Sequence, residues 1–147
     1  MLTIANFPRT LDKLAPNRDW AQLRLATDAE IDGLYGSIDA GNAVVKATFL
    51  EWTLICIDQS GKGHPNGYFL YGCLQDIGEV GTSVVHCFDF QRGLVRTKNS
   101  TYRIRQKMER DLDISDLAFL GALLYRWGLG LPLGVDPGFI FMRRESN

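Results

Sequence analysis

Three patterns of hydrophobic and polar residues follow one another along the chain. Residues 27–41 and 113–128 carry apolar side chains at helical spacing, whereas the stretch between them is rich in β-branched and aromatic residues. Apolar residues at every third or fourth position predict helices, and alternation predicts strands. This order predicts an α+β fold, with an antiparallel β-sheet or half-barrel of about five or six strands flanked by an N-terminal and a C-terminal helix.

The first predicted helix begins at a capping box. Thr27-Asp28-Ala29-Glu30 has the required spacing, and we expect the helix to stop near Gly41. Its apolar face consists of Ile31, Leu34, Tyr35 and Ile38. Gly33 and Gly36 would each cost about 1 kcal/mol against alanine, so packing must hold this helix. Before it, residues 20–25 fit a short strand and a helix nearly equally well, and both alternatives remain open.

The central region predicts a series of short strands separated by Gly, Asn and Pro. We place them at 44–50, 52–58, 67–75, 82–90, 93–98 and 101–107, and the first two can be one long strand. Residues 59–67 contain Gly61, Gly63, Pro65 and an Asn66-Gly67 pair, a composition that is typical of a hairpin loop.

The last helix has a clear beginning and end in the sequence. Asp113 or Ser115 can cap it, and Gly128 can end it. Its broad apolar face consists of Leu117, Leu120, Leu123, Leu124 and Trp127. Residues 136–138 then predict a turn into a short strand, Phe139 to Met142.

Length and composition restrict the class of protein. A chain of 147 residues without repeats or linker-like stretches predicts a single domain over residues 1–147. The start lacks the charge and apolar run of a secretory signal, and no apolar stretch is long enough for a membrane span, so we expect no membrane partner. The odd number of cysteines, without C-x-x-C spacing, suits a reducing compartment. These features predict a cytoplasmic protein.

Positive charge is concentrated in residues 92–110. This segment has seven basic residues against Glu109 alone, a local charge of +6, although the whole chain carries −1 and the remainder therefore −7. The basic residues are Arg92, Arg96, Lys98, Arg103, Arg105, Lys107 and Arg110. We take these seven, together with Tyr102, as the candidate residues for binding nucleic acid or another partner.

A two-residue turn at Asn99-Ser100 would separate these side chains by face. Val95, Thr97, Tyr102 and Ile104 would then pack on the core, and the cations from Arg96 to Lys107 would share the other face. In this register Arg96 faces Arg103, and such like charges are destabilising unless something anionic lies on them. The pattern therefore indicates an anionic partner.

Three interpretations of this basic face remain open. It can bind nucleic acid or an acidic protein surface, with Tyr102, Tyr68, Phe69 or Tyr71 available for stacking. It can be a solvated edge hairpin protected by its charges. It can also pair internally with acidic residues: Asp111, Asp113, Asp116, Asp28, Glu30 and Asp32.

Catalytic and metal sites have weaker support in the sequence. His86 and Cys87 are strand neighbours that point to opposite faces, and no third residue is placed to orient His64. The three cysteines with His64 and His86 lack the short paired spacings of zinc sites. Asp111, Asp113 and Asp116 precede a helix, where acidic caps are favoured over Mg²⁺ ligands. Residues 61–67 match no phosphate-loop motif. We assign no catalytic residue, metal or cofactor.

The segment from Gly81-Thr82-Ser83-Val84 to Val95-Arg96-Thr97-Lys98-Asn99-Ser100-Thr101-Tyr102-Arg103-Ile104 resembles short uncharacterised proteins of bacteria and their phages. The resemblance covers about 25 residues and implies a strand, a turn and a strand. It suggests an accessory protein of a phage or mobile element and implies no activity.

These observations favour a small non-catalytic binding protein, which engages nucleic acid or a nucleic-acid-handling complex through a basic hairpin and acts as an accessory or inhibitor. One alternative is an inhibitor or adaptor that docks on a protein only. Another is a small enzyme that uses the His and Cys residues or the aspartates after Arg110. The sequence leaves the oligomeric state unknown.

Overall fold

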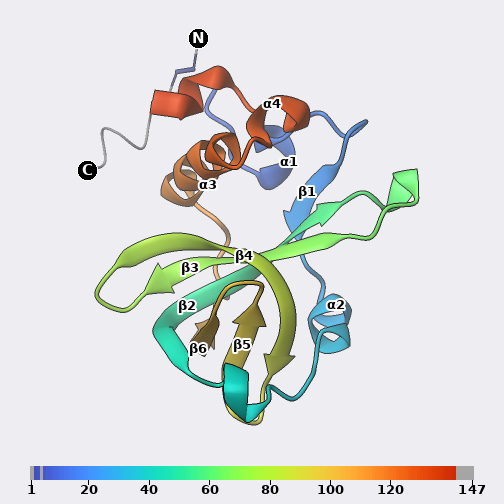
Figure 1. Cartoon of the computed structure of the whole chain (residues 1–147). Helices are drawn as coiled ribbons and strands as arrows, with labels where there is room; N and C mark the ends of the chain where they lie inside the picture. Colours follow the sequence, from blue (N-terminus) through green and yellow to red (C-terminus); the bar gives the residue numbers. More distant parts are fainter. Residues whose placement is uncertain (1, 4, 142–147) are drawn as a thin grey trace. The chain divides into compact units, whose positions relative to one another are not determined.

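The computed structural model describes residues 2, 3 and 5–141 and is a mixed α+β structure. A six-stranded sheet is accompanied by helices at both ends of the chain, which confirms the predicted fold class (Figure 1). The strands are β1 (Gln22–Leu25), β2 (Val45–Asp58), β3 (Gly67–Leu74), β4 (Gly78–Asp89), β5 (Leu94–Thr97) and β6 (Thr101–Lys107). The α-helices are α1 (Leu11–Leu14), α2 (Asp28–Gly33), α3 (Ile114–Arg126) and α4 (Gly130–Leu133). Short 3-10 turns cover Ala40–Asn42, Ser60–Lys62 and Pro137–Phe141.

The chain divides into two compact units, each assembled from separate stretches of sequence. The first unit holds residues 1–24, 57–66 and 110–147, and its described part includes α1, α3 and α4. The second unit holds residues 25–56 and 67–109, and it includes α2 and most of the strand residues. Because both units combine distant stretches, no linker separates them in the sequence. The single domain predicted over residues 1–147 stays a prediction.

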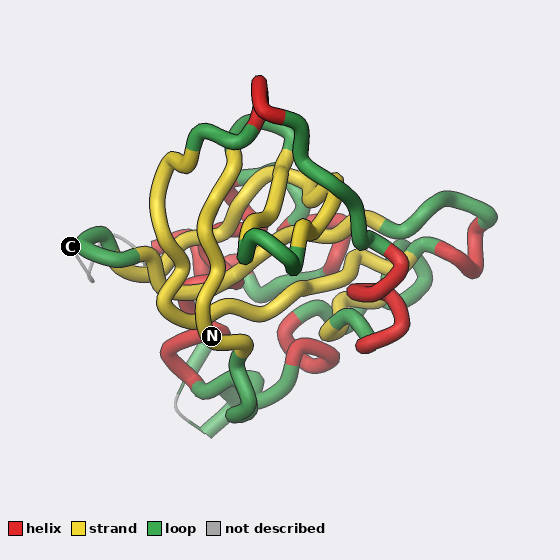
Figure 2. Tube along the Cα trace, turned by 90° about the horizontal axis from the view of Figure 1, so that it is seen from below, coloured by secondary structure: helices red, strands yellow, loops and turns green. Residues whose placement is uncertain are grey.

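Strands β2 to β6 form a closed ring of pairing within the second unit. Strand β2 pairs with β3, and β3, β4, β5 and β6 pair antiparallel in chain order. Strand β6 then returns to pair in parallel with β2. Figure 2 shows these strands as strongly curved yellow tubes. The predicted half-barrel would leave β6 as an edge strand, whereas in the structure β6 pairs with a strand on both sides and the ring is closed.

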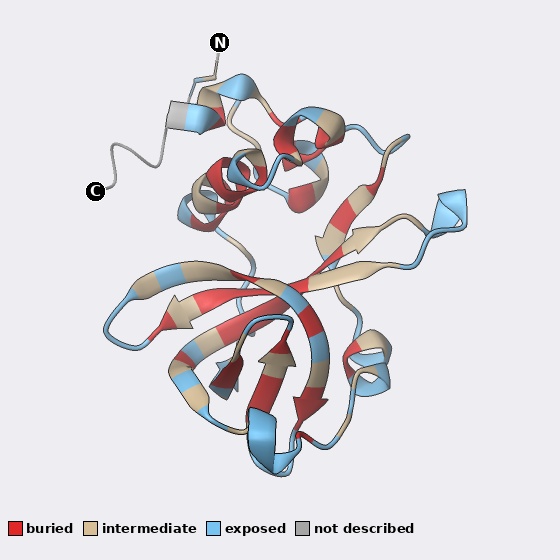
Figure 3. Cartoon of the chain, in the orientation of Figure 1, coloured by how far each residue is buried: buried red, intermediate tan, exposed pale blue. Residues whose placement is uncertain are grey.

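The ring encloses the hydrophobic core of the second unit. Figure 3 shows buried segments on each of its strands. The largest contributors include Phe49, Trp52, Leu54, Leu70, Phe88 and Val95. On β2, Phe49 and Trp52 both lie in this core although they are three positions apart. The register of β2 with β6 is continuous from Phe49 to Trp52, and its irregularity lies earlier, between Val45 and Ala47. The long β2 also joins the two strands predicted at 44–50 and 52–58.

Helix α2 begins as predicted but ends early. Its capping box is complete: the Thr27 hydroxyl accepts from the Glu30 N–H at 3.1 Å, and the Glu30 carboxylate accepts from the Thr27 N–H at 2.9 Å. The helix stops at Gly33, so the prediction that it continues to about Gly41 is wrong.

Beyond α2 the backbone pairs with β4 instead of continuing the helix. The Gly36 N–H donates to the Phe88 carbonyl at 2.8 Å, and the Phe88 N–H donates to the Leu34 carbonyl at 2.9 Å. Two glycines within four residues make helical continuation costly, so the sheet edge offers the better set of hydrogen bonds.

Helix α3 of the first unit follows the prediction at both ends. Asp113 rather than Ser115 is the cap, and Gly128 adopts a positive φ of 78° just after the helix. The strand predicted at 139–142 is wrong where the structure describes it, because Pro137–Phe141 form a 3-10 turn. Phe139 is fully buried beside Gly121 of α3, so this segment packs on a helix instead of joining a sheet. Met142 lies outside the described residues.

No helix among the described residues is long and apolar enough to cross a membrane.

Candidate functional site

The basic segment folds into the β5–β6 hairpin, but in a different register from the predicted one. Leu94 pairs with Arg103, Val95 with Tyr102, and Arg96 with Thr101. The turn therefore lies at Lys98-Asn99, one position earlier than predicted. Thr97 and Ser100 close it, since the Thr97 N–H donates to the Ser100 carbonyl at 2.8 Å and the Ser100 N–H donates to the Thr97 hydroxyl at 3.2 Å. The predicted Arg96–Arg103 pair does not form, and the repulsion inferred from it is absent.

The separation of faces survives this change of register. A slip that shifts cross-strand partners by two residues leaves every side chain on its original face. Val95, Thr97 and Tyr102 are accordingly buried, Ile104 is partly buried, and Arg103 and Arg105 are exposed. The sequence thus predicts the correct faces from an incorrect turn.

The outer face of β4, β5 and β6 is partly covered by the stretch after α2. An added Cβ on Gly36 would lie 3.2 Å from the Cβ of Cys87, and the Ile38 N–H donates to the Asp89 carboxylate at 3.2 Å. At the other end of this stretch, the Thr101 hydroxyl donates to the Asn42 carbonyl. The basic face is therefore not an open platform over its whole width.

Three of the seven cations have carboxylate partners. Arg92 lies 3.5 Å from Asp89 in the second unit, and its Nη1 also donates to the Ile38 carbonyl at 2.9 Å. Lys107 pairs with Asp28 at 3.0 Å. These two pairs, with Arg110, fit the interpretation of internal pairing for this part of the segment.

Arg110 belongs to the first unit. Its guanidinium contacts both carboxylate oxygens of Asp116, at 2.7 and 3.4 Å. Asp116 is buried, so this forked contact compensates a carboxylate that burial would otherwise destabilise. Arg110 therefore has a structural role at the start of α3.

The other four cations have no ion pair among the described residues. Arg96 is partly buried and its Nη1 donates to the Thr101 hydroxyl at 3.2 Å. Lys98, Arg103 and Arg105 are exposed and lie on the turn and on β6. Arg103 and Arg105 are two positions apart on one strand, so their Cα atoms are separated by about 7 Å. We call Lys98, Arg103 and Arg105 the basic strip.

The aromatic residues predicted for stacking are buried or partly buried. Tyr102 is 8% exposed and its ring packs edge-on against Phe49 at 5.2 Å. Phe69 and Tyr71 are also buried, and the Tyr68 hydroxyl donates to Glu30 at 2.6 Å. Tyr102 therefore packs in the core inside the ring of strands, beneath the basic strip. A buried side chain in this position cannot contact a ligand on the surface.

No protein-family model, curated protein or solved structure matches this chain.

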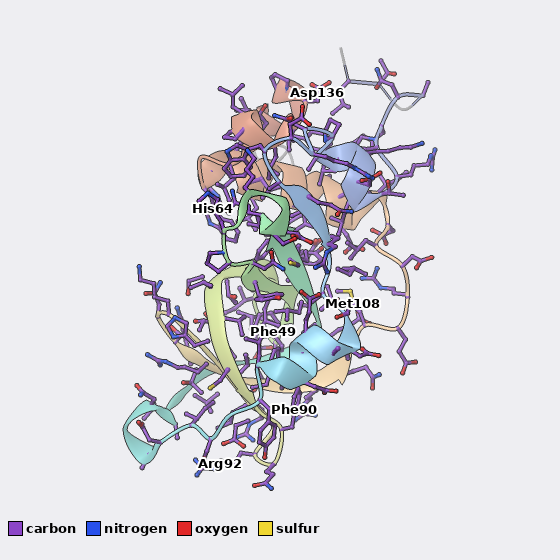
Figure 4. The ribbon with its side chains drawn as sticks, turned by 90° about the vertical axis from the view of Figure 1, so that its right-hand side faces the viewer. Phe49, His64, Phe90, Arg92, Met108 and Asp136 are labelled. Atoms are coloured by element: carbon purple, nitrogen blue, oxygen red, sulfur yellow. The ribbon has the colours of Figure 1, made fainter. Side chains whose placement is uncertain are left out.

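Two exposed aromatic rings that the sequence analysis did not select lie at the end of β4. Tyr35 is 54% and Phe90 40% exposed, and the rings stack with centroids 6.2 Å apart. Figure 4 shows Phe90 and Arg92 at the same end of the second unit. The sequence analysis did not select Tyr35, because its spacing placed it on the apolar face of the predicted helix, which would have turned its side chain toward the core.

Cys87 and its strand neighbour His86 do not form a nucleophile–base pair. Burial, and secondarily the charge of Asp89, raises the pKa of the Cys87 thiol, which disfavours the reactive thiolate. His86 is exposed on the neighbouring position of the strand, and His64 belongs to the first unit. Among the described residues, no three His, Cys, Asp or Glu side chains gather where they could hold a metal ion.

Asp113 and Asp116 form the capping box at the start of α3. The Asp113 carboxylate accepts from the Asp116 N–H at 2.9 Å, and the Asp116 carboxylate accepts from the Asp113 N–H at 2.8 Å. Both side chains thus accept hydrogen bonds from the backbone, as the cap interpretation predicts.

The first unit contains a cavity of about 500 Å³. Residues 5–9, Lys13, Asp136 and others line it, and no His or Cys is among the described residues that do so.

Proposed function

We propose that this chain is a non-catalytic binding protein that engages nucleic acid through the basic strip. The observation that carries the proposal is the division of the cations: Lys98, Arg103 and Arg105 are exposed and have no ion pair among the described residues. Of the other four cations, three are held by carboxylates, namely Arg92, Lys107 and Arg110, and Arg96 is partly buried and donates to the Thr101 hydroxyl. The strip is the part of the segment that is left for an external anion.

The chemistry of the strip suits a phosphate backbone. Arginine forms forked hydrogen bonds with phosphate oxygens and stays charged at every relevant pH. Arg103 and Arg105 repeat along a single strand, as phosphates repeat along a nucleic-acid strand. The remaining sequence outside residues 92–110 is strongly acidic, so a polyanion would be directed to this segment by repulsion elsewhere. An accessory or inhibitor role within a nucleic-acid-handling complex stays a prediction.

Salt dependence of binding tests the proposal. Each phosphate neutralised on a single strand contributes about −0.7 to the slope of log K against log salt, so three contacts give about −2. The double variant Arg103→Ala/Arg105→Ala should reduce the steepness of this slope by about 1.4. Fluorescence anisotropy of labelled single- and double-stranded DNA and RNA at several salt concentrations measures it.

A charge-matched control separates the strip from net charge. Lys13 and Lys62 are exposed cations of the first unit, and Lys13→Ala/Lys62→Ala, which removes two charges as the strip variant does, should leave the slope unchanged. Absence of binding to every nucleic acid at low salt contradicts the proposal and favours docking on an acidic protein surface instead.

A further inference from the structure

The basic strip has a second strand beside it. Strand β6 pairs with β5 on one side and in parallel with β2 on the other (Figure 1). The stretch after α2 covers part of the outer face on the side of β4, so β2 is the open neighbour of Arg103 and Arg105. The outward side chains of β2 therefore decide what else an anion on the strip would touch.

The pairing of β2 with β6 shows which side chains share the outer face. Ala47 and Ile104 pack against the core of the second unit, and Phe49 belongs to it. Their neighbours along the two strands point outward, because side chains alternate in a strand, and they are exposed or partly exposed. These neighbours are Arg103 and Arg105 on β6, and Lys46, Thr48 and Leu50 on β2.

Two side chains of β2 lie directly beside the arginines. Thr48 is the partner of Arg103 in the parallel ladder. The register is continuous from Thr48 to Glu51, which places Leu50 beside Arg105. Neighbouring strands are about 5 Å apart, so a ligand group bound to either arginine is within reach of the adjacent side chain on β2.

Thr48 offers a hydroxyl that is available to a phosphate. It is partly exposed, and the part of the chain that the structure describes supplies no hydrogen bond to its side chain. Its backbone is held on both sides, since it pairs with Arg103 and its carbonyl accepts from the Gln75 N–H at 2.9 Å. A donor fixed in this way beside a guanidinium loses little conformational freedom when it binds an anion.

Lys46 adds a fourth cation from outside the basic segment. It is exposed and forms no ion pair with any described residue. It lies at the irregularity in the register of β2 with β6, and such irregularities redirect a side chain. Because Lys46 is two positions from Thr48 on the same strand, its Cα is about 7 Å away. A phosphate beside Thr48 is therefore within reach of its long side chain.

Leu50 gives the same face an apolar contact. Its side chain is 41% exposed. A bare phosphate chain gains nothing from covering an apolar side chain, whereas the carbon atoms of a sugar or base do. The face thus combines cations, a hydroxyl and an apolar group, which match the phosphates and nucleosides that alternate along a nucleic-acid strand.

We infer that the outer face of β2 completes the basic strip as a site for the sugar-phosphate chain of a nucleic-acid strand. Lys46 and Thr48 bind phosphate together with Arg103, and Leu50 contacts the apolar part of a neighbouring nucleoside. The inference rests on the proposed function and adds selectivity for nucleic acid over a bare polyanion.

The test compares a labelled DNA single strand of about 15 nucleotides with inorganic polyphosphate. Lys46→Ala should weaken binding of both and lower the steepness of the salt slope by about 0.7, whereas Lys46→Arg should keep the slope. Thr48→Val, which keeps the branched shape, should weaken both about 2- to 10-fold with an unchanged slope. Leu50→Ala should weaken DNA binding about 3- to 5-fold and leave polyphosphate binding unchanged.

Two matched variants serve as controls. Lys62→Ala removes one exposed cation of the first unit, as Lys46→Ala does in the second. Leu25→Ala truncates a leucine of the second unit that is 45% exposed on β1, outside the paired stretch of β2 and β6. Neither should change binding of DNA or polyphosphate. Because the substituted side chains are exposed or partly exposed, thermal unfolding of the variants should match that of the wild type.

The outcomes separate the inference from the proposed function. If the three β2 variants bind DNA like the wild type while Arg103→Ala/Arg105→Ala flattens the salt slope, the inference is overturned and the proposed function stands. If Leu50→Ala weakens DNA and polyphosphate equally, the nucleoside contact is overturned. If the wild type binds no nucleic acid at low salt, both the inference and the proposed function are overturned.

Discussion

The absence of a side chain at position 72 allows β3 to approach β2. An added Cβ would overlap the carbonyl oxygen of Glu51 and lie 2.9 Å from the Cα of Trp52, and backbone atoms cannot move aside as a flexible side chain can. We therefore expect Gly72→Ala to lower the free energy of unfolding by about 1–3 kcal/mol or more. Denaturant unfolding measures the change.

Gly67 provides the matched control on the same strand. An added Cβ there meets nothing within 4 Å, and the residue has no positive φ. Gly67→Ala should be neutral or stabilise the protein by up to about 1 kcal/mol, because alanine restricts the unfolded chain. If both variants lowered the free energy of unfolding equally, the close approach of β2 at position 72 would not be the cause of the effect.

Asp58 makes the stability of the protein depend on pH. Hydrogen bonds from the hydroxyl and N–H of Ser60 lower the pKa of the Asp58 carboxyl, with a smaller contribution from Arg24. A lowered pKa in the folded state stabilises the protein above the unfolded pKa of about 4, and this contribution disappears as the pH falls through the folded pKa. Asp58→Asn should therefore be destabilising at pH 7 and progressively less so below about pH 4.

Unfolding of the wild type and variant across this pH range measures the difference. Asp19, an exposed aspartate of the same unit, is the control, and Asp19→Asn should show no such trend. A constant difference at every pH would contradict an effect of the Asp58 charge.

At the scale of elements, the two capping boxes show that a cap starts a helix but does not set its length. Both α2 and α3 carry complete boxes, yet α2 has 6 residues and α3 has 13. Leu117, Leu120 and Leu124 are fully buried along α3, whereas Ile31 is the buried residue of α2. Helix length thus follows the apolar face that tertiary packing can cover.

The cap of α3 is nevertheless important for stability. Asp113→Ala removes the acceptor for the Asp116 N–H and should cost about 0.5–2 kcal/mol of unfolding free energy. Ser115→Ala, in the exposed first turn of the same helix, should change it little. Urea unfolding followed by circular dichroism measures both. An equal effect of the two substitutions would contradict a specific contribution of the cap hydrogen bond from the Asp116 N–H to Asp113.

At the scale of the whole molecule, charge is distributed unevenly over a nearly neutral chain. The segment 92–110 carries +6, but three of its cations are neutralised by carboxylates within their own units. The charge available to a ligand is therefore smaller than the sequence count, which is why a slope near −2 is expected from this segment and a steeper one is not. The position of each carboxylate, rather than the number of cations, sets the expected salt dependence.

Local pattern was sufficient to predict the α+β class, most strand positions, the start of α3 and the two faces of the β5–β6 hairpin, and it left the cap of α3 open between Asp113 and Ser115. These features depend on periodicity and on hydrogen bonds between residues three or four positions apart, and both can be read along the chain. The exposed Arg103 and Arg105 follow from the same alternation, which tolerates the two-residue error in partner assignment.

Only the tertiary structure decided the remaining features. The sheet edge at Phe88 ended α2 and placed Tyr35 on the surface, and the pairing of β6 with β2 closed the ring. Three cations of the basic segment form ion pairs with Asp89, Asp28 and Asp116, and the positions of these carboxylates therefore determine which cations can still bind an external anion. The end of α2, the closure of the ring and the Lys107–Asp28 pair depend on contacts between residues distant in sequence, and at every one of these sites alternative hydrogen bonds or ion pairs compete. Periodicity alone carries no information about that competition.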